Sequence, residues 1–206
     1  MSSEAAPVPD PHRGEDGAVP LTRAQRQQRT RRALIDAARV AFGRDGYHGA
    51  NLTAIAAEAG YSKGAVYSNF ASKAELFLAV MDLDLDRLRA GGFDPLATNE
   101  AIDARQTEIL GEIRGFALAT LEFTAAALRD EELGTEFRQR IAVLLTAYHG
   151  FATEHRTDDE QLELEQLALL LVALDQGMAL LTVSGLPVDT ALLRAGLRRL
   201  VSPPPP

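Results

Sequence analysis

The sequence predicts an all-α protein, and three observations point that way. The 206 residues contain no sustained alternation of apolar and polar residues, which is the pattern of a β-strand, and the β-branched residues are scattered. Apolar residues recur instead at intervals of three and four, as on one face of a helix. Since 46% of the residues are apolar, the chain can also bury a sizeable core, which argues against global disorder.

The N-terminal part predicts one long and two short helices. The first covers about residues 22–44, and its apolar face is formed by Ala33, Leu34, Ala37, Ala38, Ala41 and Phe42. Three glycines in residues 43–51 indicate a loop. Residues 52–59 form a short helix that stops at Gly60, and residues 61–70 form the second. A glycine turn therefore separates the two short helices.

Longer helices are expected after this point. Ser72 and Glu75 have the S-x-x-E spacing of a capping box, which predicts a helix from Ser72 to about Gly91. Further on, the acids from Asp158 to Glu160 would place favourable negative charge at a helix start. The remaining helices are expected at about residues 99–128, with Gly115 as a point where this one can break, and at 131–155, 158–184 and 187–201.

These elements divide the chain into four parts. Residues 1–21 are rich in proline, glycine, alanine and acids, so we expect a disordered tail. Residues 22–71 hold the first three helices as one small domain. Residues 72–201 form a larger helical domain, in which 72–90 is a connecting helix. Residues 202–206, SPPPP, end the chain as a polyproline tail.

Targeting signals and cofactor sites are not expected. Residues 1–20 lack the basic start and apolar stretch of a signal peptide, and the apolar run at 167–174 is too short to span a bilayer. Cysteine is absent, which excludes disulfides and thiolate metal sites and suits a reducing compartment. We therefore expect a cytoplasmic protein with no membrane partner, no metal and no cofactor.

Charge is distributed unevenly along the chain. The net charge is −8, but residues 21–75 hold nine basic and four acidic residues, a balance of +5. Residues 76–206 hold eleven basic and twenty-one acidic residues, a balance of −10. A basic segment joined to an acidic body is typical of a local nucleic-acid site. The alternative is that the arginines only line solvated helix faces.

The two short helices, LTAIAAEAG and YSKGAVYSNF, predict a helix-turn-helix DNA-binding domain. Alanines let the first helix pack closely under the second, which would enter the major groove. Lys63 can reach guanine O6/N7 or a phosphate, and Tyr67 lies on the same face four residues later. Gly64 would let the backbone approach DNA closely. A plain amphipathic helix with solvated polar groups is the alternative.

The sequence from about residue 25 to 77 resembles the TetR family of transcriptional repressors. The matching pieces are A-x-x-x-F-x-x-x-G-Y from Ala38 to Tyr47, L-T-x-I-A-x-x-A-G at 52–60, and S-K-G-x-V-Y-x-x-F-x-S-K-x-E-L-F at 62–77. The resemblance implies a helical C-terminal ligand domain and a homodimer on a near-palindromic operator. It implies that the residues near DNA are Arg29, Thr53, Ser62, Lys63, Gly64, Tyr67 and Asn69, with Lys73 on a phosphate.

Two details qualify this resemblance. Many members have histidine where this chain has Asn69, which leaves that contact open. The only two lysines in the chain, Lys63 and Lys73, both fall in the motif, whereas nineteen arginines supply the other positive charge. This distribution favours a specific use of lysine at these positions.

The larger domain is expected to hold an effector and the twin subunit. We expect a small, mainly apolar effector among candidate residues Phe116, Glu122, Phe123, Tyr148, His149, Phe151, Gln176 and Met178. Plain core packing is the alternative for each aromatic. A dimer contact is expected at the apolar stripe Leu167, Leu170, Leu171, Leu174 and Leu181, although such a stripe can equally be an internal core.

An enzyme is not indicated. The sequence has no H-E-x-x-H, P-loop, G-x-S-x-G or dinucleotide fingerprint, and His149 and His155 do not share a helix face. No catalytic residue is therefore assigned. The remaining alternative is a helical adaptor or orphan regulator of the same fold that acts through protein contacts without an effector.

Overall fold

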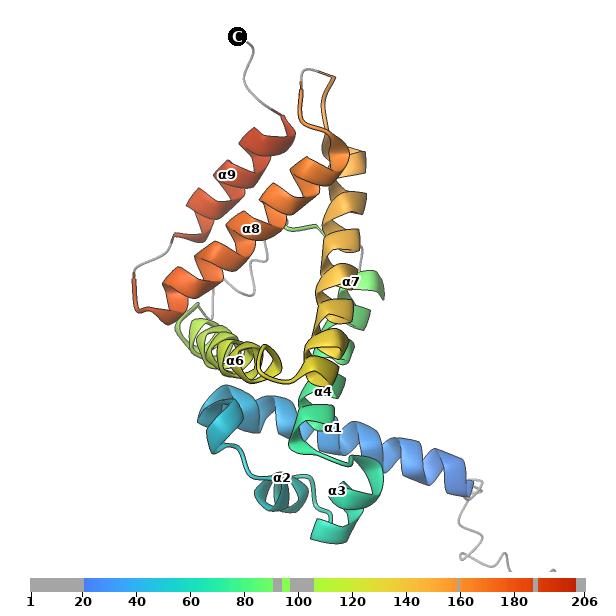
Figure 1. The fold of residues 1–206 in the computed structure, drawn as a ribbon. Helices are drawn as coiled ribbons and strands as arrows, with labels where there is room; N and C mark the ends of the chain where they lie inside the picture. Colours follow the sequence, from blue (N-terminus) through green and yellow to red (C-terminus); the bar gives the residue numbers. More distant parts are fainter. Residues whose placement is uncertain (1–20, 91–93, 97–105, 159, 187–188, 203–206) are drawn as a thin grey trace, which may run out of the picture.

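The computed structural model describes residues 21–90, 94–96, 106–158, 160–186 and 189–202. These residues form eight helices and no strand, which confirms the all-α prediction (Figure 1). In chain order the helices are α1 Arg23–Gly49, α2 Leu52–Glu58, α3 Lys63–Asn69, α4 Lys73–Ala90, α6 Gln106–Ala127, α7 Glu131–His155, α8 Leu164–Val183 and α9 Thr190–Val201. The expected tails, residues 1–20 and 203–206, lie outside the described residues.

The first three helices, which we call the head, start at capped residues. Thr22 accepts a hydrogen bond from the backbone of Gln25, and the Gln25 side chain accepts one in return. Asn51 caps α2 through Thr53 N (2.8 Å), and Ser62 caps α3 through Ala65 N (3.3 Å). The structure thus confirms both short helices.

Helix α1 runs further than the sequence predicted. Only Gly46 leaves helical geometry, with φ 73° and ψ 173°, a conformation that glycine adopts without strain. The chain resumes a helical turn after this kink and ends with Ala50 N donating to Gly46 O (3.2 Å). The predicted loop at residues 43–51 is therefore wrong, because a single glycine makes the bend.

Helix α4 joins the head to helices α6–α9, which we call the body, and packs on both α1 and α7 (Figure 1). The predicted cap is present: Ser72 Oγ accepts from Glu75 N (3.0 Å), and the Glu75 carboxylate accepts from Ala71 N (2.6 Å). Asp82 of α4 forms two hydrogen bonds with Arg140 of α7, at 2.9 and 2.8 Å. Ion pairs and apolar contacts therefore hold this helix between the two parts.

The body departs from the sequence prediction at two places. Helix α6 passes unbroken through Gly115, where the lack of a side chain lets it rest on α1: a Cβ there would lie 1.8 Å from Gly43 O. Helix α8 begins at Leu164, because Glu160 closes a turn by accepting from Leu162 N (2.7 Å). Asp158 and Glu160 precede the helix instead of starting it.

Two apolar clusters form the core. The first joins α1–α4 to α6 and contains a stack of aromatic rings, in which the ring of Phe77 lies 4.9 Å from that of Phe42 and 4.5 Å from that of Phe123. The second lies between α7, α8 and α9 around Tyr148 and Leu167. The first cluster crosses the predicted boundary at residue 72, and the division into domains remains a prediction.

Candidate nucleic-acid interface

The α2–α3 unit presents a polar face because its apolar residues are buried behind it. Ile55 of α2 and Val66 of α3 are fully buried and join the first core cluster. Between the helices, Gly60 adopts φ 77°, and Tyr61 N donates to Ala56 O (2.8 Å) across the turn. The residues predicted to approach DNA lie on the outside, all exposed to solvent: Thr53, Ser62, Lys63, Gly64 and Tyr67.

Lys63 and Tyr67 form the centre of this face. Tyr67 is 52% exposed, an unusual state for an aromatic ring in a helix, and Lys63 Nζ lies 5.8 Å from the centre of that ring. Lys63 has no ion pair with any described residue. Its ammonium is therefore available to a negatively charged or hydrogen-bond-accepting partner.

The fold of the chain does not itself require glycine at position 64. A Cβ at that position would meet only Ser62 Oγ, at an ordinary 3.7 Å, and Gly64 has no positive φ. Glycine within a helix costs roughly 1 kcal/mol relative to alanine. A partner that approaches the backbone of α3 closely would account for this residue.

Asn69 is bound within its own helix. Its side-chain nitrogen donates to Ala65 O (2.8 Å) and to Ser68 Oγ (3.4 Å), which occupies both N–H groups. Its backbone carbonyl accepts from Arg31 Nη1 (2.7 Å). In the free protein the donors of Asn69 thus stabilise the end of α3, and its phosphate contact remains a prediction.

Lys73 also differs from the sequence prediction. Its Nζ donates to His48 O (3.0 Å) and Ala50 O (3.2 Å) and lies 5.0 Å from the centre of the Tyr47 ring. Burial lowers the pKa of Lys73, and the nearby charge of Glu122 opposes that shift. In the free protein Lys73 therefore joins the start of α4 to the end of α1. A phosphate contact through its third N–H remains a prediction.

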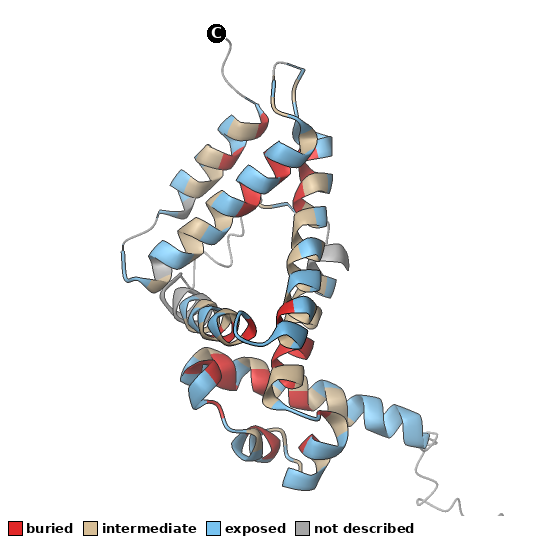
Figure 2. Cartoon of the chain, viewed as in Figure 1, coloured by how far each residue is buried: buried red, intermediate tan, exposed pale blue. Residues whose placement is uncertain are grey.

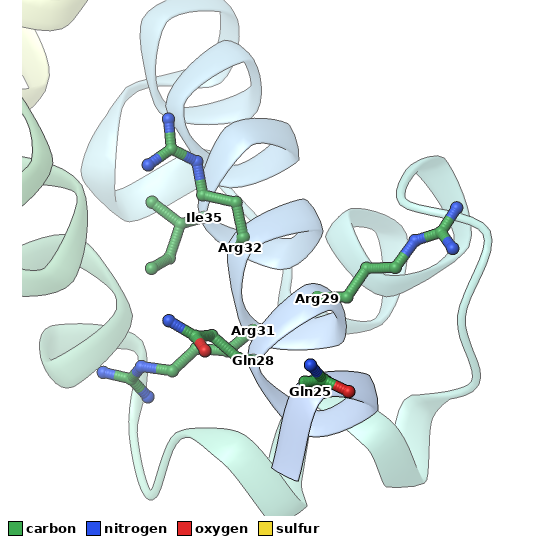
Figure 3. A pocket seen from close by; sticks show the side chains of 6 residues that line it. All are labelled: Gln25, Gln28, Arg29, Arg31, Arg32 and Ile35. Atoms are coloured by element: carbon green, nitrogen blue, oxygen red, sulfur yellow. The ribbon is translucent and has the colours of Figure 1, made fainter. Parts of the chain in front are cut away.

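Arginines line an open hollow along the first turns of α1. Figure 3 shows Arg29 and Arg31 leaving the helix on opposite sides, and the lining is completed by Gln25, Gln28, Arg32 and Ile35. The guanidinium of Arg31 lies 4.2 Å from the centre of the Phe70 ring and also donates a hydrogen bond to Asn69 O. Arg31 therefore links the end of α3 to α1. The sequence indicated its charge but not this structural role.

The arginines nearest the start of α1 have a different environment. Arg23, Arg26 and Arg29 are exposed and have no ion pair with a described residue. In Figure 2 the first turns of α1 have the pale blue colour of exposed residues. The first turn of the helix contains no acid. Positive charge at a helix start opposes the helix dipole, so this arrangement does not serve the stability of α1. It favours the binding of an anion.

The comparison with known sequences agrees with this geometry. A profile of the family described as "Bacterial regulatory proteins, tetR family" matches residues 34–80, which extend from α1 through the two short helices into α4. The likeness to the TetR family is thus shown for this segment, which is less than half of the chain. The transcriptional activator FasR of Mycolicibacterium smegmatis is 42% identical over 76 residues, which are 37% of this chain and 34% of FasR. The chain therefore spans about a third of the length of this TetR-type relative.

Solved structures show that the TetR fold extends beyond the matched segment. A TetR transcription regulator from Haloarcula marismortui superposes with a TM-score of 0.63, 20% identity, and coverage of 84% of this chain and 97% of its own. FadR of Bacillus subtilis, solved in complex with stearoyl-CoA, superposes with a TM-score of 0.54 and 20% identity, covering 83% and 97%. At these identities the likeness concerns the fold alone.

Four of the eight predicted effector contacts, the aromatic ones, lie in or against the two core clusters. Phe123 and Tyr148 are fully buried, Phe151 is 2% exposed, and Phe116 packs on the first cluster. Phe116 and Phe123 contact the Phe77 ring, and Phe151 stacks on His155. That these residues line an effector pocket remains a prediction. Glu122 accepts a hydrogen bond from His48 N at the end of α1 (2.9 Å), and its assignment to an effector pocket remains a prediction.

The remaining polar candidates lie on α7 and α8. His149 lines an open, mainly apolar hollow with Leu145, Thr146, Glu165, Ala168 and Leu169. Gln176 is exposed and donates to Asp175 (3.0 Å), and Met178 is half-buried. Burial raises the pKa of Asp175, whereas hydrogen bonds from Tyr148 and Gln176 oppose this; burial also raises the pKa of Tyr148. No group of acids and histidines among the described residues could hold a metal ion.

Helix α8 has one buried and one exposed apolar side. Leu167 and Leu171 are fully buried against α7 and α9, which agrees with the alternative of an internal core for these two residues; Leu174 is half-buried. Leu170 and Leu181 are 43% and 42% exposed. Other exposed leucines in this part of the chain are Leu169, Leu180, Leu186 and Leu192. An apolar surface of this kind is typical of a protein interface.

The apolar character of α8 also bears on the membrane prediction. Residues 164–181 reach a mean hydropathy of 1.5, so by length and composition alone they would suffice to cross a membrane. The eight-residue run at 167–174 is too short on its own, and the longer helix around it meets the length criterion. The side of α8 buried against α7 and α9 is that of a core helix in a helical bundle.

Proposed function

We propose that the chain is a ligand-responsive transcriptional regulator that binds a near-palindromic DNA operator as a homodimer and, in its simplest form, represses. The observation that carries this proposal is the exposed face of α3. Lys63, Gly64 and Tyr67 occupy that face, while the opposite side of the helix is fixed in the core. A regulator of this kind acts in the cytoplasm, where the DNA is.

Helix α3 would enter the major groove. Lys63 would donate to guanine O6/N7 or to a phosphate, and Tyr67 would donate its hydroxyl to a phosphate or pack on a thymine methyl. Ser62 and Thr53, exposed at the starts of α3 and α2, would bind phosphates. Sequence preference would thus come from a few side chains, and position on the duplex from the others.

The exposed arginines of α1 would supply affinity that does not depend on base sequence. Arg23, Arg26 and Arg29 have no ion pair with a described residue, and each contact to a phosphate would release counterions. The binding constant would then fall steeply with salt concentration, with a slope that decreases by roughly 0.9 for each phosphate contact removed.

A homodimer would set the spacing of the two recognition helices. The exposed leucines of α8 and α9 support a contact between two copies of the chain, since a second copy would remove them from water. Two α3 helices about 34 Å apart would read successive major grooves on one side of the duplex, which is why the operator would be nearly palindromic.

A small, mainly apolar effector would bind in the body and weaken DNA binding. FadR, which shares this fold, was solved with stearoyl-CoA, a ligand with a long apolar chain. Asp175 and Gln176 of α8 and His149 of α7 are the polar groups that we assign to such a site. An effector that favours one arrangement of head and body by about 1–3 kcal/mol would change DNA affinity by a factor of roughly 5 to 150.

Selection of DNA from a random duplex pool tests the proposal. The purified protein would be incubated with the pool at two salt concentrations, and the retained DNA sequenced. We expect a palindromic consensus that survives the higher salt while non-specific DNA is lost. A folded dimer that enriches no sequence would contradict the proposal and favour the adaptor that acts through protein contacts.

A further inference from the structure

The end of α1 is held by a residue of the body. Residues Gly46–Asn51, which we call the corner, contain the kink of α1 and lead directly into α2. The Glu122 carboxylate of α6 accepts a hydrogen bond from His48 N (2.9 Å). A Cβ on Gly46 would lie 2.9 and 3.0 Å from the two Glu122 oxygens, so the carboxylate rests directly on the kink.

The same corner is also held by Lys73 of α4. The ammonium donates to the carbonyls of His48 and Ala50, and the charge of Glu122 raises the pKa of Lys73 against the effect of burial. An acid from the body and a base from the connecting helix thus bind opposite backbone groups of one short segment. The segment has few ways to move without breaking one of these contacts.

The corner determines where the recognition unit starts. Asn51, its last residue, caps α2, and α2 packs on α3. A rotation of the corner would therefore tilt both short helices relative to α1. The distance between helices α6 and α1 is set by a close backbone contact, in which Gly115 rests against the Gly43 carbonyl. The distance between α6 and α1 leaves Glu122 within reach of His48.

We propose that Glu122 is a positioning residue for DNA recognition, which holds the corner in the orientation that binds the operator and makes DNA affinity depend on the placement of α6. The inference rests on the proposed function and adds to it the contact through which the body acts on the head. Displacement of α6 would remove the acceptor from His48 N and release the corner.

The sign of the effect separates this role from simple electrostatics. Glu122 is an acid in a protein whose proposed partner is a polyanion, so removal of its charge alone would strengthen DNA binding. Loss of a positioning contact would weaken specific binding instead. Non-specific binding, which depends on charge more than on geometry, would be unchanged or slightly stronger.

The experiment compares Glu122→Ala and Glu122→Gln with wild type on the selected operator and on unrelated DNA, at one salt concentration. We expect about a tenfold weaker Kd for the operator with Glu122→Ala, in line with the loss of a charged hydrogen bond. Glu122→Gln retains an acceptor for His48 N but not the charge, so a smaller loss is expected. Glu154→Gln, an exposed acid on α7, is the matched control and should leave Kd unchanged.

Hydrogen exchange supplies a second readout that needs no DNA. The amides of residues 46–51 should exchange faster in Glu122→Ala than in wild type, while those of α7 and α8 should not change. Wild-type Kd and wild-type exchange in both Glu122 variants would overturn the inference and leave the proposed function intact. If wild type itself selects no operator, the proposed function fails, and the positioning role fails with it.

Discussion

At the scale of single residues, neighbours decide what a side chain does. Lys63 and Lys73 are the two lysines of the chain and both lie in the motif. Lys63 is exposed beside Tyr67, whereas the ammonium of Lys73 is bound by two carbonyls at the end of α1. The first is free to meet a partner, and the second holds helices together. Their difference arises from folding and could not be read from the motif.

Asp175 gives a prediction about pH. Burial raises the pKa of this carboxyl above its ordinary value of 3.8, so the folded state holds the proton more tightly than the unfolded state. Its contribution to stability is complete below pH 3.8 and is lost as pH rises through the raised pKa. Asp175→Asn should therefore gain stability relative to wild type over this range, by at most about 1.4 kcal/mol per pH unit.

Urea unfolding of both proteins at a series of pH values, at one protein concentration, would measure this difference. The difference between the two unfolding free energies isolates Asp175 from the other titrating groups. If the unfolding free energies of the two proteins differ by a constant amount from pH 4 to pH 8, Asp175 titrates alike in the folded and unfolded states.

At the scale of helices, close contacts between backbones fix how the elements cross. Gly115 is the clearest case, since a Cβ there would collide with the Gly43 carbonyl. Gly115→Ala should destabilise the protein by about 2–3 kcal/mol because α6 must move away from α1. Gly150→Ala is the matched control: nothing lies within 4 Å, so a gain of roughly 0.5–1 kcal/mol is expected. Thermal unfolding of both variants would test the pair, and equal stability would contradict it.

Capping and periodicity predicted the helices well where the signals are local. Asp130 caps α7 through Leu133 N, and the prediction of residues 131–155 matches the helix found. The end of α1 and the start of α8 were missed, because a single kink and a side-chain turn decide them. Contacts of Glu122 with His48 and of Arg31 with Asn69 join residues 74 and 38 positions apart, which no local pattern encodes.

The candidate site divides in the same way. The polar face of α3 was predictable, since hydrophobic spacing gives the buried side and the motif gives the exposed one. The effector contacts were not, because a buried aromatic in a helix has the same pattern whether it meets a ligand or another ring. Phe123 illustrates this, with Phe77 and Tyr47 as its neighbours.

At the scale of the whole molecule, the exposed leucines of α8 carry the prediction of a dimer. Leu170→Glu together with Leu181→Glu should raise the dimer dissociation constant at least about 100-fold. The double variant loses two apolar side chains that the dimer would bury, and it places charges in the interface. Leu128→Glu, at a residue 76% exposed just after α6, is the control and should not change assembly. Sedimentation velocity over a range of concentrations would distinguish the variants. Unchanged assembly in the double variant would place the interface elsewhere.

The distribution of charge also matters at this scale. The basic head and the acidic body have opposite signs, so DNA would be attracted to one part of the chain and repelled by the other. Such a field would orient the protein on a duplex with the α2–α3 face inward. It would also restrict the contact to the segment that matches the family.

The central claim is that α3 reads bases in two symmetric half-sites, and one measurement tests it most directly. DNA selected from a random pool by Lys63→Ala would be sequenced beside that selected by wild type. For wild type we predict a palindromic consensus. For Lys63→Ala we predict the same spacing of half-sites, but a weaker base preference at one matching position in each half-site. The lost discrimination between bases at each such position would be about 1–3 kcal/mol. An identical consensus and affinity from the two proteins would contradict the claim.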